Sequence, residues 1–155
     1  MTEIHAAAQL GFSREARTYA RGRPDYPAAL LPWLTDDLGV APGKVVVDLG
    51  AGTGKFTKLL VATGAHVIAV EPVAAMRAQL AVILPGVQQL PGTADAIPLA
   101  EAAADALVCA QAFHWFATEL ALAEIRRVLR PGGRLGLIWN VRDESVDWVA
   151  TISEI

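Results

Sequence analysis

The stretch Lys44–Thr57 reads KVVVDLGAGTGKFT, and it decides the fold of the chain. The apolar run Val45–Val47 with Leu49 is typical of a short strand that is buried on both faces. Asp48 stands inside this run, and a helical pattern begins soon after it. Between them lie three glycines at alternate positions: Gly50, Gly52 and Gly54. A strand, a glycine turn and a helix start predict a ligand site at the carboxyl end of a parallel sheet.

The spacing of the glycines limits the kind of ligand. The dinucleotide pattern G-x-G-x-x-G requires a further glycine where the chain has Lys55 or Thr57. The phosphate-binding P-loop pattern fails at Leu49 and again at Phe56. What remains is D-x-G-x-G-x-G, in which Asp48 precedes backbone that a ligand can approach closely. An acid at this point suits a ligand that carries a positive group and no phosphate.

The composition indicates one globular domain with a large core. The chain has 155 residues, of which 54% are hydrophobic and 19% are charged. A formal net charge of −3 argues against a nucleic-acid surface, which needs clustered Lys and Arg. The single cysteine, Cys109, excludes an internal disulfide and a cysteine zinc site, and its apolar neighbours predict a buried thiol; no metal site is visible. Because we find no signal segment and no membrane-spanning apolar run, we expect a cytoplasmic protein without a membrane partner.

Strands and helices alternate along the chain on short connections. The expected strands are 45–49, 66–70, 87–90, 106–112 and 134–140, and the expected helices are 13–21, 27–38, 56–63, 73–84 and 118–129. Gly39 and Gly64 are placed to end the second and third helices, and Thr118 to begin the last. Such alternation predicts an α/β fold in which helices cover both faces of a parallel sheet.

Two further positions carry chemistry. Glu71 lies 21 residues beyond Gly50, at the end of the second strand, where an acid can accept hydrogen bonds from ribose hydroxyls. The alternative is a solvated acid at a strand end. His114, within Gln111–Phe116 (QAFHWF), is the tentative catalytic residue, because an imidazole can orient or deprotonate a substrate hydroxyl. A His-Trp-Phe cluster can equally line a pocket or cap a core.

The motif D-x-G-x-G-x-G closely resembles the first motif of class I S-adenosylmethionine (SAM)-dependent methyltransferases. RVLRPGGRLGLIWN, ending at Asn140, resembles the fifth-strand motif of the same fold. The head FSREARTYARGRPDYP resembles the small-molecule branch that includes trans-aconitate methyltransferase-like and type 11 methyltransferase-domain proteins. The resemblance extends from Phe12 to about Trp148. It implies a Rossmann-like, doubly wound parallel sheet with strand order 3-2-1-4-5 and an N-terminal helical lid.

The resemblance also implies the residues that bind SAM. They are Asp48, Gly50, Ala51, Gly52, Thr53, Gly54, Glu71, Pro72, Met76, Ala94, Asp95, Ala96, Gln111 and Ala112. In the family, the counterpart of Glu71 binds the ribose, and that of Asp95 accepts from the adenine amino group while Met76 packs near the adenine. Asp95 can also be read as a turn former.

Other residues are implied to face the substrate or to close over the site: Tyr19, Arg23, Tyr26, His114 and Trp115. Arg23 is suited to clamp a carboxylate, because the guanidinium offers paired donors. The alternative is that Arg23 pairs with Asp25 or bonds a backbone carbonyl.

Family members continue with a sixth and a seventh strand that are missing here. We therefore expect one domain with a cap at 1–40, a sheet core at 41–140 and the start of a further helix at 141–155. The fifth strand is then an uncovered edge, through which the chain can form a homodimer. The expected activity is methyl transfer from SAM, by in-line displacement, to a carboxylate or hydroxyl of a small molecule, with S-adenosylhomocysteine as product. The alternatives are a non-catalytic SAM-binding or assembly domain and, less favoured, an NAD(P)-dependent oxidoreductase.

Overall fold

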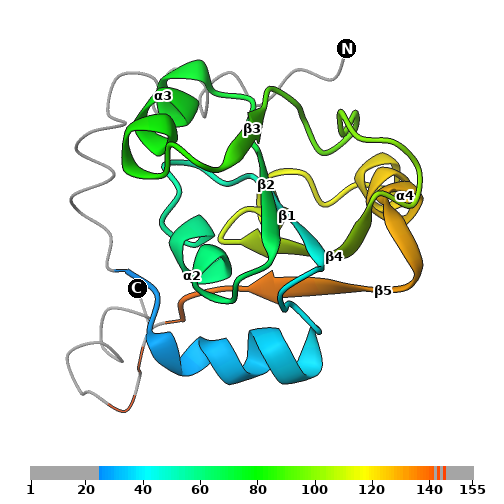
Figure 1. Cartoon of the computed structure of the whole chain (residues 1–155). Coiled ribbons are helices and arrows are strands. Elements are labelled where there is room, and N and C mark those ends of the chain that lie inside the picture. Colours follow the sequence, from blue (N-terminus) through cyan, green and yellow to red (C-terminus); the bar gives the residue numbers. More distant parts are fainter. Residues whose placement is uncertain (1–24, 142, 144, 146–155) are drawn as a thin grey trace.

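A five-stranded parallel sheet forms the centre of the computed structural model, which describes residues 25–141, 143 and 145 (Figure 1). The strands are β1 (Val45–Leu49), β2 (His66–Val70), β3 (Gln88–Leu90), β4 (Ala104–Ala110) and β5 (Leu129–Ile138). Their order is β3-β2-β1-β4-β5, and every neighbouring pair is parallel. The predicted Rossmann-like order is therefore confirmed. From β1 to β3 successive strands are added on one side of β1, and β4 and β5 are added on the other side. The order of the strands thus reverses between β1 and β4, which is where such folds bind ligands.

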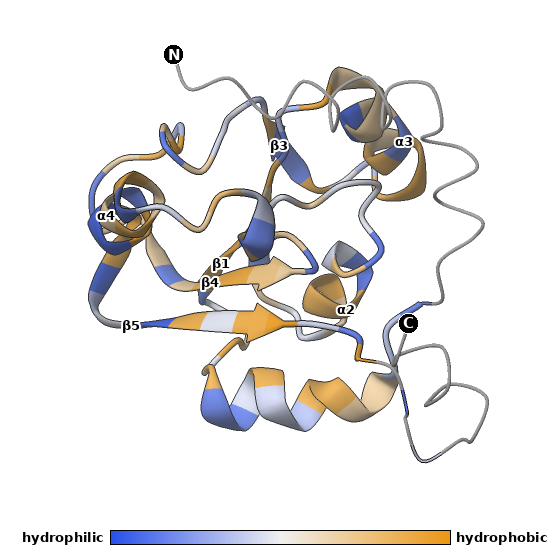
Figure 2. Cartoon of the chain, turned by 180° about the vertical axis from the view of Figure 1, so that it is seen from behind, coloured by the Kyte–Doolittle hydropathy of each residue, from blue (hydrophilic) through white to orange (hydrophobic). Residues whose placement is uncertain are grey.

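Helices cover both faces of this sheet. The α-helices are α2 (Thr57–Ala62), α3 (Ala74–Ile83) and α4 (Glu119–Val128), and the short helical turns are η1 (Ala28–Leu30), η2 (Trp33–Asp37) and η3 (Phe113–Trp115). α2, α3 and the helical segment 28–37 pack on one face, and α4 packs on the other (Figures 1 and 2). Figure 2 shows hydrophobic colouring on the central strands β1 and β4, as expected for strands covered on both sides.

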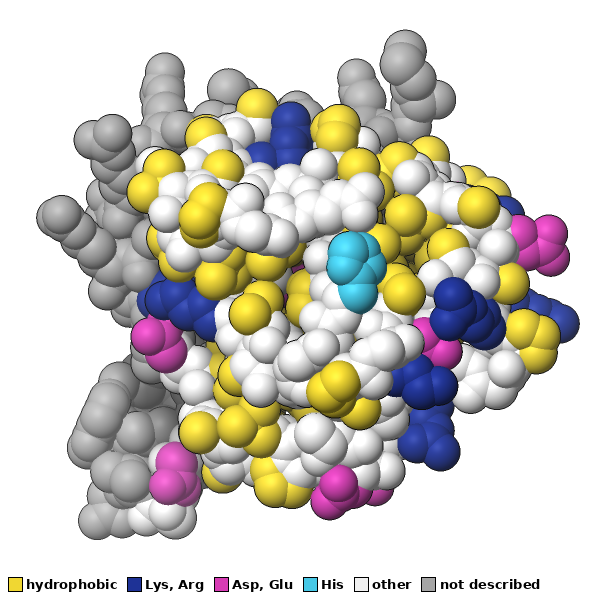
Figure 3. All heavy atoms as spheres, viewed as in Figure 1, with side chains coloured by type: hydrophobic (Ala, Val, Ile, Leu, Met, Phe, Trp, Pro, Cys, Tyr) yellow, Lys and Arg dark blue, Asp and Glu magenta, His cyan; other side chains and the backbone are white. Residues whose placement is uncertain are grey.

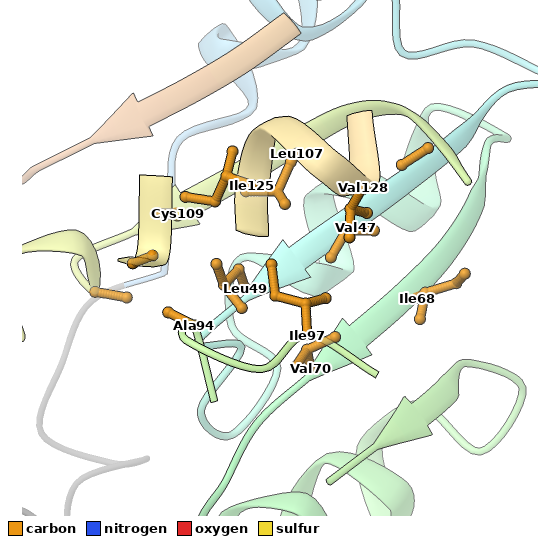
Figure 4. Packing of buried hydrophobic residues seen from close by; sticks show 13 residues of the cluster. Val47, Leu49, Ile68, Val70, Ala94, Ile97, Leu107, Cys109, Ile125 and Val128 are labelled. Carbon is orange, nitrogen blue, oxygen red and sulfur yellow. The ribbon is translucent and has the colours of Figure 1, made fainter. Parts of the chain in front are cut away.

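Side chains that alternate along each strand divide the core into two layers. Val47 and Leu49 of β1 pack with Leu107 of β4 and with Ile125 and Val128 of α4 (Figure 4). The intervening strand positions point to the opposite face, because successive strand side chains alternate. This second layer comprises Val46, Val67, Ala106 and Val108 with Leu34, Phe56 and Leu60. Cys109 is fully buried in the first layer, and burial raises the pKa of its thiol, as expected for an inert cysteine.

The predicted helix ends agree with the backbone conformation. Gly39 has φ +68° and Gly64 has φ +78°, the left-handed conformation that ends a helix at low cost for glycine. At the start of α4, the Thr118 hydroxyl accepts a 3.1 Å hydrogen bond from the Ala121 backbone N–H. These caps explain why the sequence located α2 and α4 to within one or two residues.

The bounds of the last two strands differ from those predicted. β4 ends at Ala110 and not at residue 112, because Gln111 adopts the left-handed conformation with φ +55° and breaks the ladder. β5 begins at Leu129 and not at Arg134, since Leu129 already pairs with Ala104. The Pro-Gly-Gly segment lies between Leu129 and Arg134. It is accommodated by a register shift between β4 and β5, with Gly132 at φ +79°.

β5 is the outermost strand on its side of the sheet. In the described part of the chain, no strand pairs with its outer edge. The hydrogen bond from the Gln111 N–H to the Ile138 carbonyl sets the phase of the ladder, so that residues 134, 136 and 138 bond to β4. The backbone N–H and C=O groups of Leu135 and Leu137 therefore point away from the sheet.

Candidate functional site

The glycine loop after β1 turns through three left-handed residues at the carboxyl edge of the sheet. Gly50, Gly52 and Gly54 have φ values of +76°, +57° and +86°. A Cβ on Gly50 would lie 2.7 Å from the Ala112 Cβ, and one on Gly54 would lie 2.8 Å from the Leu80 Cγ. A Cβ on Gly52 would meet nothing closer than the Met76 Sδ, at 3.8 Å. Packing thus requires the outer two glycines, whereas the middle one leaves space beside bare backbone.

Asp48 lies beneath this loop and is 1% exposed. The Thr57 hydroxyl donates a 2.6 Å hydrogen bond to its Oδ2, while Oδ1 is buried and has no hydrogen-bond partner among the described residues. Burial raises the pKa of Asp48 to about 7, an effect that the Thr57 bond opposes and the negative charge of Glu71 reinforces. A buried carboxyl group with one unused oxygen can accept a bond from a cationic ligand.

Glu71 follows β2 and approaches the same loop. Its Oε2 accepts a 2.9 Å hydrogen bond from the Gly52 N–H, and its Oε1 accepts a 2.8 Å bond from the Val73 N–H. The residue is 5% exposed, and desolvation raises the pKa of its carboxyl group despite these two bonds. The structure therefore rules out the alternative of a solvated strand-end acid.

The residues after Glu71 are held in place by Arg77 of α3. One nitrogen of its guanidinium, Nη1, donates to the carbonyls of Glu71 and Pro72, at 2.6 and 2.8 Å. Met76, from the same helix, is buried with its sulfur beside Gly52. The structure thus brings Met76 to the glycine loop, and the roles of Pro72 and Met76 in binding SAM stay predictions.

The loop after β3 carries the predicted residues Ala94, Asp95 and Ala96. Ala94 is buried in the core, Ala96 is exposed, and the Asp95 Oδ1 accepts a 3.1 Å hydrogen bond from the Thr118 hydroxyl. This bond joins the loop to the N-cap of α4. The adenine-binding role of Asp95 stays a prediction.

α4 also fixes the second half of that loop. Arg127 donates to the carbonyls of Ile97 and Leu99, at 3.0 and 2.7 Å, and Glu124 accepts a 2.9 Å bond from the Ile97 N–H. Arg127 and Glu124 also form an ion pair with a 2.6 Å separation. The loop is therefore anchored at both ends to one helix.

The segment after β4 lies against the glycine loop. Gln111 is left-handed, a conformation that is uncommon for a residue with a side chain and that concentrates at functional sites. Ala112 is buried and touches the space over Gly50. His114 and Trp115 are exposed, with ring centroids 5.0 Å apart. The indole N–H of Trp139, one residue beyond β5, donates a 3.3 Å hydrogen bond to the His114 Nδ1.

The segment before η1 also reaches this edge of the sheet. The ring of Tyr26 meets that of Phe56 edge to face, with centroids 4.9 Å apart. Asp25 forms an ion pair with Lys55 at 3.7 Å. Tyr26 therefore packs on Phe56, which lies two residues beyond Gly54, and its role over the donor or substrate stays a prediction. Tyr19, Arg23 and the expected helix 13–21 lie outside the described residues.

The sequence analysis missed three residues that shape this site: Thr57, Arg77 and Trp139. Thr57 carried a usable signal, because a threonine in the first turn after the glycine loop can reach back toward the preceding strand. Arg77 and Trp139 carried none, since their partners are backbone carbonyls and an imidazole from other elements.

Two general properties of the described residues bear on the chemistry. No three His, Cys, Asp or Glu side chains among them gather closely enough to hold a metal ion. None of the helices they form combines the length and the apolar character that crossing a bilayer demands.

The doubly wound sheet, the glycine loop and the two buried acids define the class of Rossmann-like nucleoside-binding proteins. Comparison with known families identifies a methyltransferase domain over residues 47–137. The chain belongs to this methyltransferase family, and the cofactor that goes with the family is SAM. The narrower branch suggested by the N-terminal head stays a prediction.

Several relatives agree with this assignment. An uncharacterised methyltransferase of Mycobacterium tuberculosis (strain H37Rv) is 47% identical over 155 residues, which are 100% of this chain and 62% of that protein. A malonyl-[acyl-carrier protein] O-methyltransferase of Methylococcus capsulatus is 40% identical over 63% of this chain and 38% of its own length. The solved structure of a protein assigned as a type II methyltransferase, from Anaeromyxobacter dehalogenans, is 35% identical with a TM-score of 0.65, over 77% of this chain and 50% of that one. The chain thus spans less than two thirds of the length of these relatives.

The residues of the site fit SAM. The donor carries an ammonium, a ribose and an adenine, and it has no phosphate. The unused Oδ1 of Asp48 would be an acceptor for a cationic group, the Glu71 carboxylate would bind the ribose hydroxyls, and Gly52 leaves room against the backbone. These three residues would hold the donor.

Proposed function

We propose that the protein is a SAM-dependent methyltransferase that transfers a methyl group to an oxygen atom of a small molecule. The observation that carries this proposal is the arrangement of Asp48 and Glu71, two buried acids that end neighbouring strands near the glycine loop, where Glu71 accepts from the Gly52 N–H. Burying two carboxyl groups is costly. The cost is understandable where a cationic nucleoside binds beside them, since Asp48 keeps a buried oxygen that no described residue uses.

The task of the protein in this reaction is alignment. When bound, SAM supplies an activated methyl group on a sulfonium, which is already a good leaving group. The glycine loop and Glu71 fix the donor, while the segment at Ala112 and His114 borders the side from which an acceptor enters. Holding two reactants in line is worth roughly 7–11 kcal/mol of the barrier, so this geometry can account for much of the catalysis without a metal ion.

A small acceptor with a carboxylate or hydroxyl fits the surface better than a nucleic acid does. The net charge is −3, and Figure 3 shows Lys and Arg side chains interspersed with acidic ones on the face in view. Binding phosphates requires a continuous basic surface. One relative, whose name describes O-methylation of malonyl-[acyl-carrier protein], supports an oxygen as the methyl acceptor.

Two other functions make different predictions. A non-catalytic SAM-binding domain would retain the same donor site without an acceptor, and the chain's partial coverage of its relatives favours testing this alternative. An NAD(P)-dependent oxidoreductase would share the strand, the turn and Glu71, but Lys55 occupies the position where its fingerprint requires glycine.

Isothermal titration separates these functions at the first step. We expect SAM and S-adenosylhomocysteine to bind and NAD to give no heat of binding. Binding of NAD without binding of SAM would overturn the proposal. The second step is methyl transfer from labelled SAM to a panel of small carboxylic acids and alcohols, with the 47% identical M. tuberculosis relative, of which this chain spans 62%, tested in parallel. SAM binding without transfer by either protein would favour the non-catalytic domain.

A further inference from the structure

His114 and Trp139 form a pair at the carboxyl edge of the sheet that the sequence does not reveal. His114 is in η3, which follows β4, and Trp139 directly follows β5. The Trp139 Nε1–H donates a 3.3 Å hydrogen bond to the His114 Nδ1. The same segment touches the glycine loop, since a Cβ on Gly50 would meet Ala112 and Phe116. The segment that carries the imidazole is therefore next to the candidate donor site.

The direction of this bond determines where the imidazole proton lies. An indole N–H can only donate, so the Nδ1 that receives it must be unprotonated. In a neutral imidazole the proton is then on Nε2. A histidine that acts as a base through Nε2 has the opposite arrangement, in which Nδ1–H donates to a carboxylate or carbonyl and leaves Nε2 free to take a proton.

We propose that Trp139 is a positioning residue that holds His114 in the Nε2–H tautomer, so that His114 serves the methyl acceptor as a hydrogen-bond donor and the acceptor is a carboxylate. This inference rests on the proposed function and narrows its substrate class from carboxylate or hydroxyl to carboxylate. It also replaces the general-base role considered for His114.

The reaction with a carboxylate needs no base. One carboxylate oxygen forms the new O–C bond with its lone pair while the methyl–sulfur bond breaks, and the sulfur retains that electron pair. No proton is released, so the reaction does not need an unprotonated Nε2 to act as a base. A hydroxyl acceptor would lose a proton, and a histidine whose Nε2 is already protonated cannot accept it. The Nε2–H is suited to the second carboxylate oxygen, because N–H groups bond to charged oxygens more strongly than to neutral ones.

Long-range ¹H–¹⁵N correlation spectra of the ¹⁵N-labelled protein measure the tautomer directly. At about pH 8.5 imidazoles are neutral, and the three histidines of the chain are assigned by comparison with H114Q. We expect the His114 Nε2 to carry the proton in the wild type and both tautomers to be populated in W139F, which keeps the ring but lacks the donor. W115F changes the neighbouring indole and leaves the Trp139 bond intact, so it should retain the wild-type spectrum. A protonated Nδ1 in the wild type, or no change in W139F, would overturn the assignment.

Kinetics with the acceptor panel test the consequence. With a carboxylate acceptor we expect H114L to lower kcat/KM by roughly 10- to 100-fold, mainly through KM, because a hydrogen bond to a charged group is lost. H114Q, whose amide still donates, should recover most of that loss. Equal losses of kcat in both variants, or transfer to hydroxyls only, would contradict the donor role.

The two sets of results separate this inference from the proposed function. The spectra require no ligand, so absence of SAM binding with an Nε2–H tautomer would refute the methyltransferase proposal, and the carboxylate acceptor with it, while the positioning of His114 by Trp139 would stand. Methyl transfer by a protein whose His114 carries its proton on Nδ1 would refute this inference alone.

Discussion

The Thr57 hydroxyl donates a 2.6 Å hydrogen bond to the Asp48 Oδ2, and in the described structure the other oxygen of that carboxyl group is buried without a partner. The pair joins β1 to the first turn of α2 directly beneath the glycine loop. One oxygen of Asp48 is therefore used in a structural contact, and the other is available to a ligand. One prediction concerns the Asp48 carboxyl group and one concerns the Thr57 hydroxyl.

Asp48 should make the stability of the ligand-free protein depend on pH. Its pKa is 3.8 in an ordinary environment and about 7 in the folded protein, so between these values the folded state holds a proton that the unfolded state has lost. The contribution of Asp48 to the free energy of unfolding should be greatest below about pH 4 and should fall as the pH rises through about 7, by up to roughly 4 kcal/mol, since each pKa unit is worth about 1.4 kcal/mol.

Urea unfolding at a series of pH values measures this dependence. Asp48→Asn, which cannot ionise, should remove most of it, whereas Asp37→Asn at an exposed position of η2 should leave it unchanged. An identical pH dependence in Asp48→Asn would show that other groups are responsible.

Thr57→Val should destabilise the protein more than its volume suggests. Valine has the shape of threonine but cannot donate to Asp48, and losing the partner of a buried polar group costs about 1–3 kcal/mol. Thr57→Ser retains the hydroxyl and should recover part of the loss. The matched control is Thr35→Val, at an exposed threonine of η2, which should change the free energy of unfolding by less than about 1 kcal/mol. Equal effects of Thr57→Val and Thr35→Val in chemical denaturation would refute the role of the buried bond.

Gly52→Val should abolish SAM binding while the protein still folds. A Cβ at this position meets nothing closer than 3.8 Å, so the cost to folding is the left-handed backbone alone, about 1–3 kcal/mol. The valine side chain would occupy the space proposed for the donor, and we expect an affinity loss of at least roughly 100-fold in isothermal titration.

The control for this substitution is Gly43→Val. Gly43 also has positive φ, +81°, with no atom within 4 Å of a Cβ, and it lies in the turn before β1, at the opposite end of the strand. It should lose similar stability and keep its SAM affinity. Wild-type affinity in Gly52→Val would mean that the donor site is elsewhere.

The outer edge of β5 leads to a prediction about assembly, and we propose that the chain forms a homodimer by pairing along this edge. Because the amides of Leu135 and Leu137 point outward, pairing with a second copy would protect them from hydrogen exchange, more strongly at higher protein concentration. The inward amides of Gly136 and Ile138 bond to β4 and should be protected at every concentration. Fast exchange at Leu135 and Leu137 together with a monomeric mass in sedimentation would refute the dimer.

The order of the elements and the place of the site could be predicted from the linear sequence. β1 and β2 are short runs of β-branched residues, and Gly39 and Gly64 stop helices because they adopt a conformation that other residues resist. These signals are local. The proximity of Asp48, Gly52 and Glu71 could also be predicted, since the ends of neighbouring parallel strands must meet at one edge of the sheet.

The bounds of β4 and β5 were beyond such reasoning. Gln111 has no local reason to be left-handed, and it becomes so where the chain leaves β4 while its N–H bonds to Ile138 of β5. Pro131 and the two glycines after it look like a turn, yet Leu129 pairs with β4 before them. In both cases the neighbouring strand decides the conformation, because its hydrogen bonds outweigh local preference.

The sequence by itself thus determined the fold class and the place of Asp48 and Glu71 at one edge of the sheet, because periodicity, glycine chemistry and strand polarity act over a few residues; the strand order came from the family resemblance. Only the tertiary structure decided that Asp48 retains an unused buried oxygen and that His114 faces an indole donor. Those properties depend on Thr57 and Trp139, which arrive from other elements, and a hydrogen bond is defined by the distance and direction of two atoms that the linear order of residues does not contain.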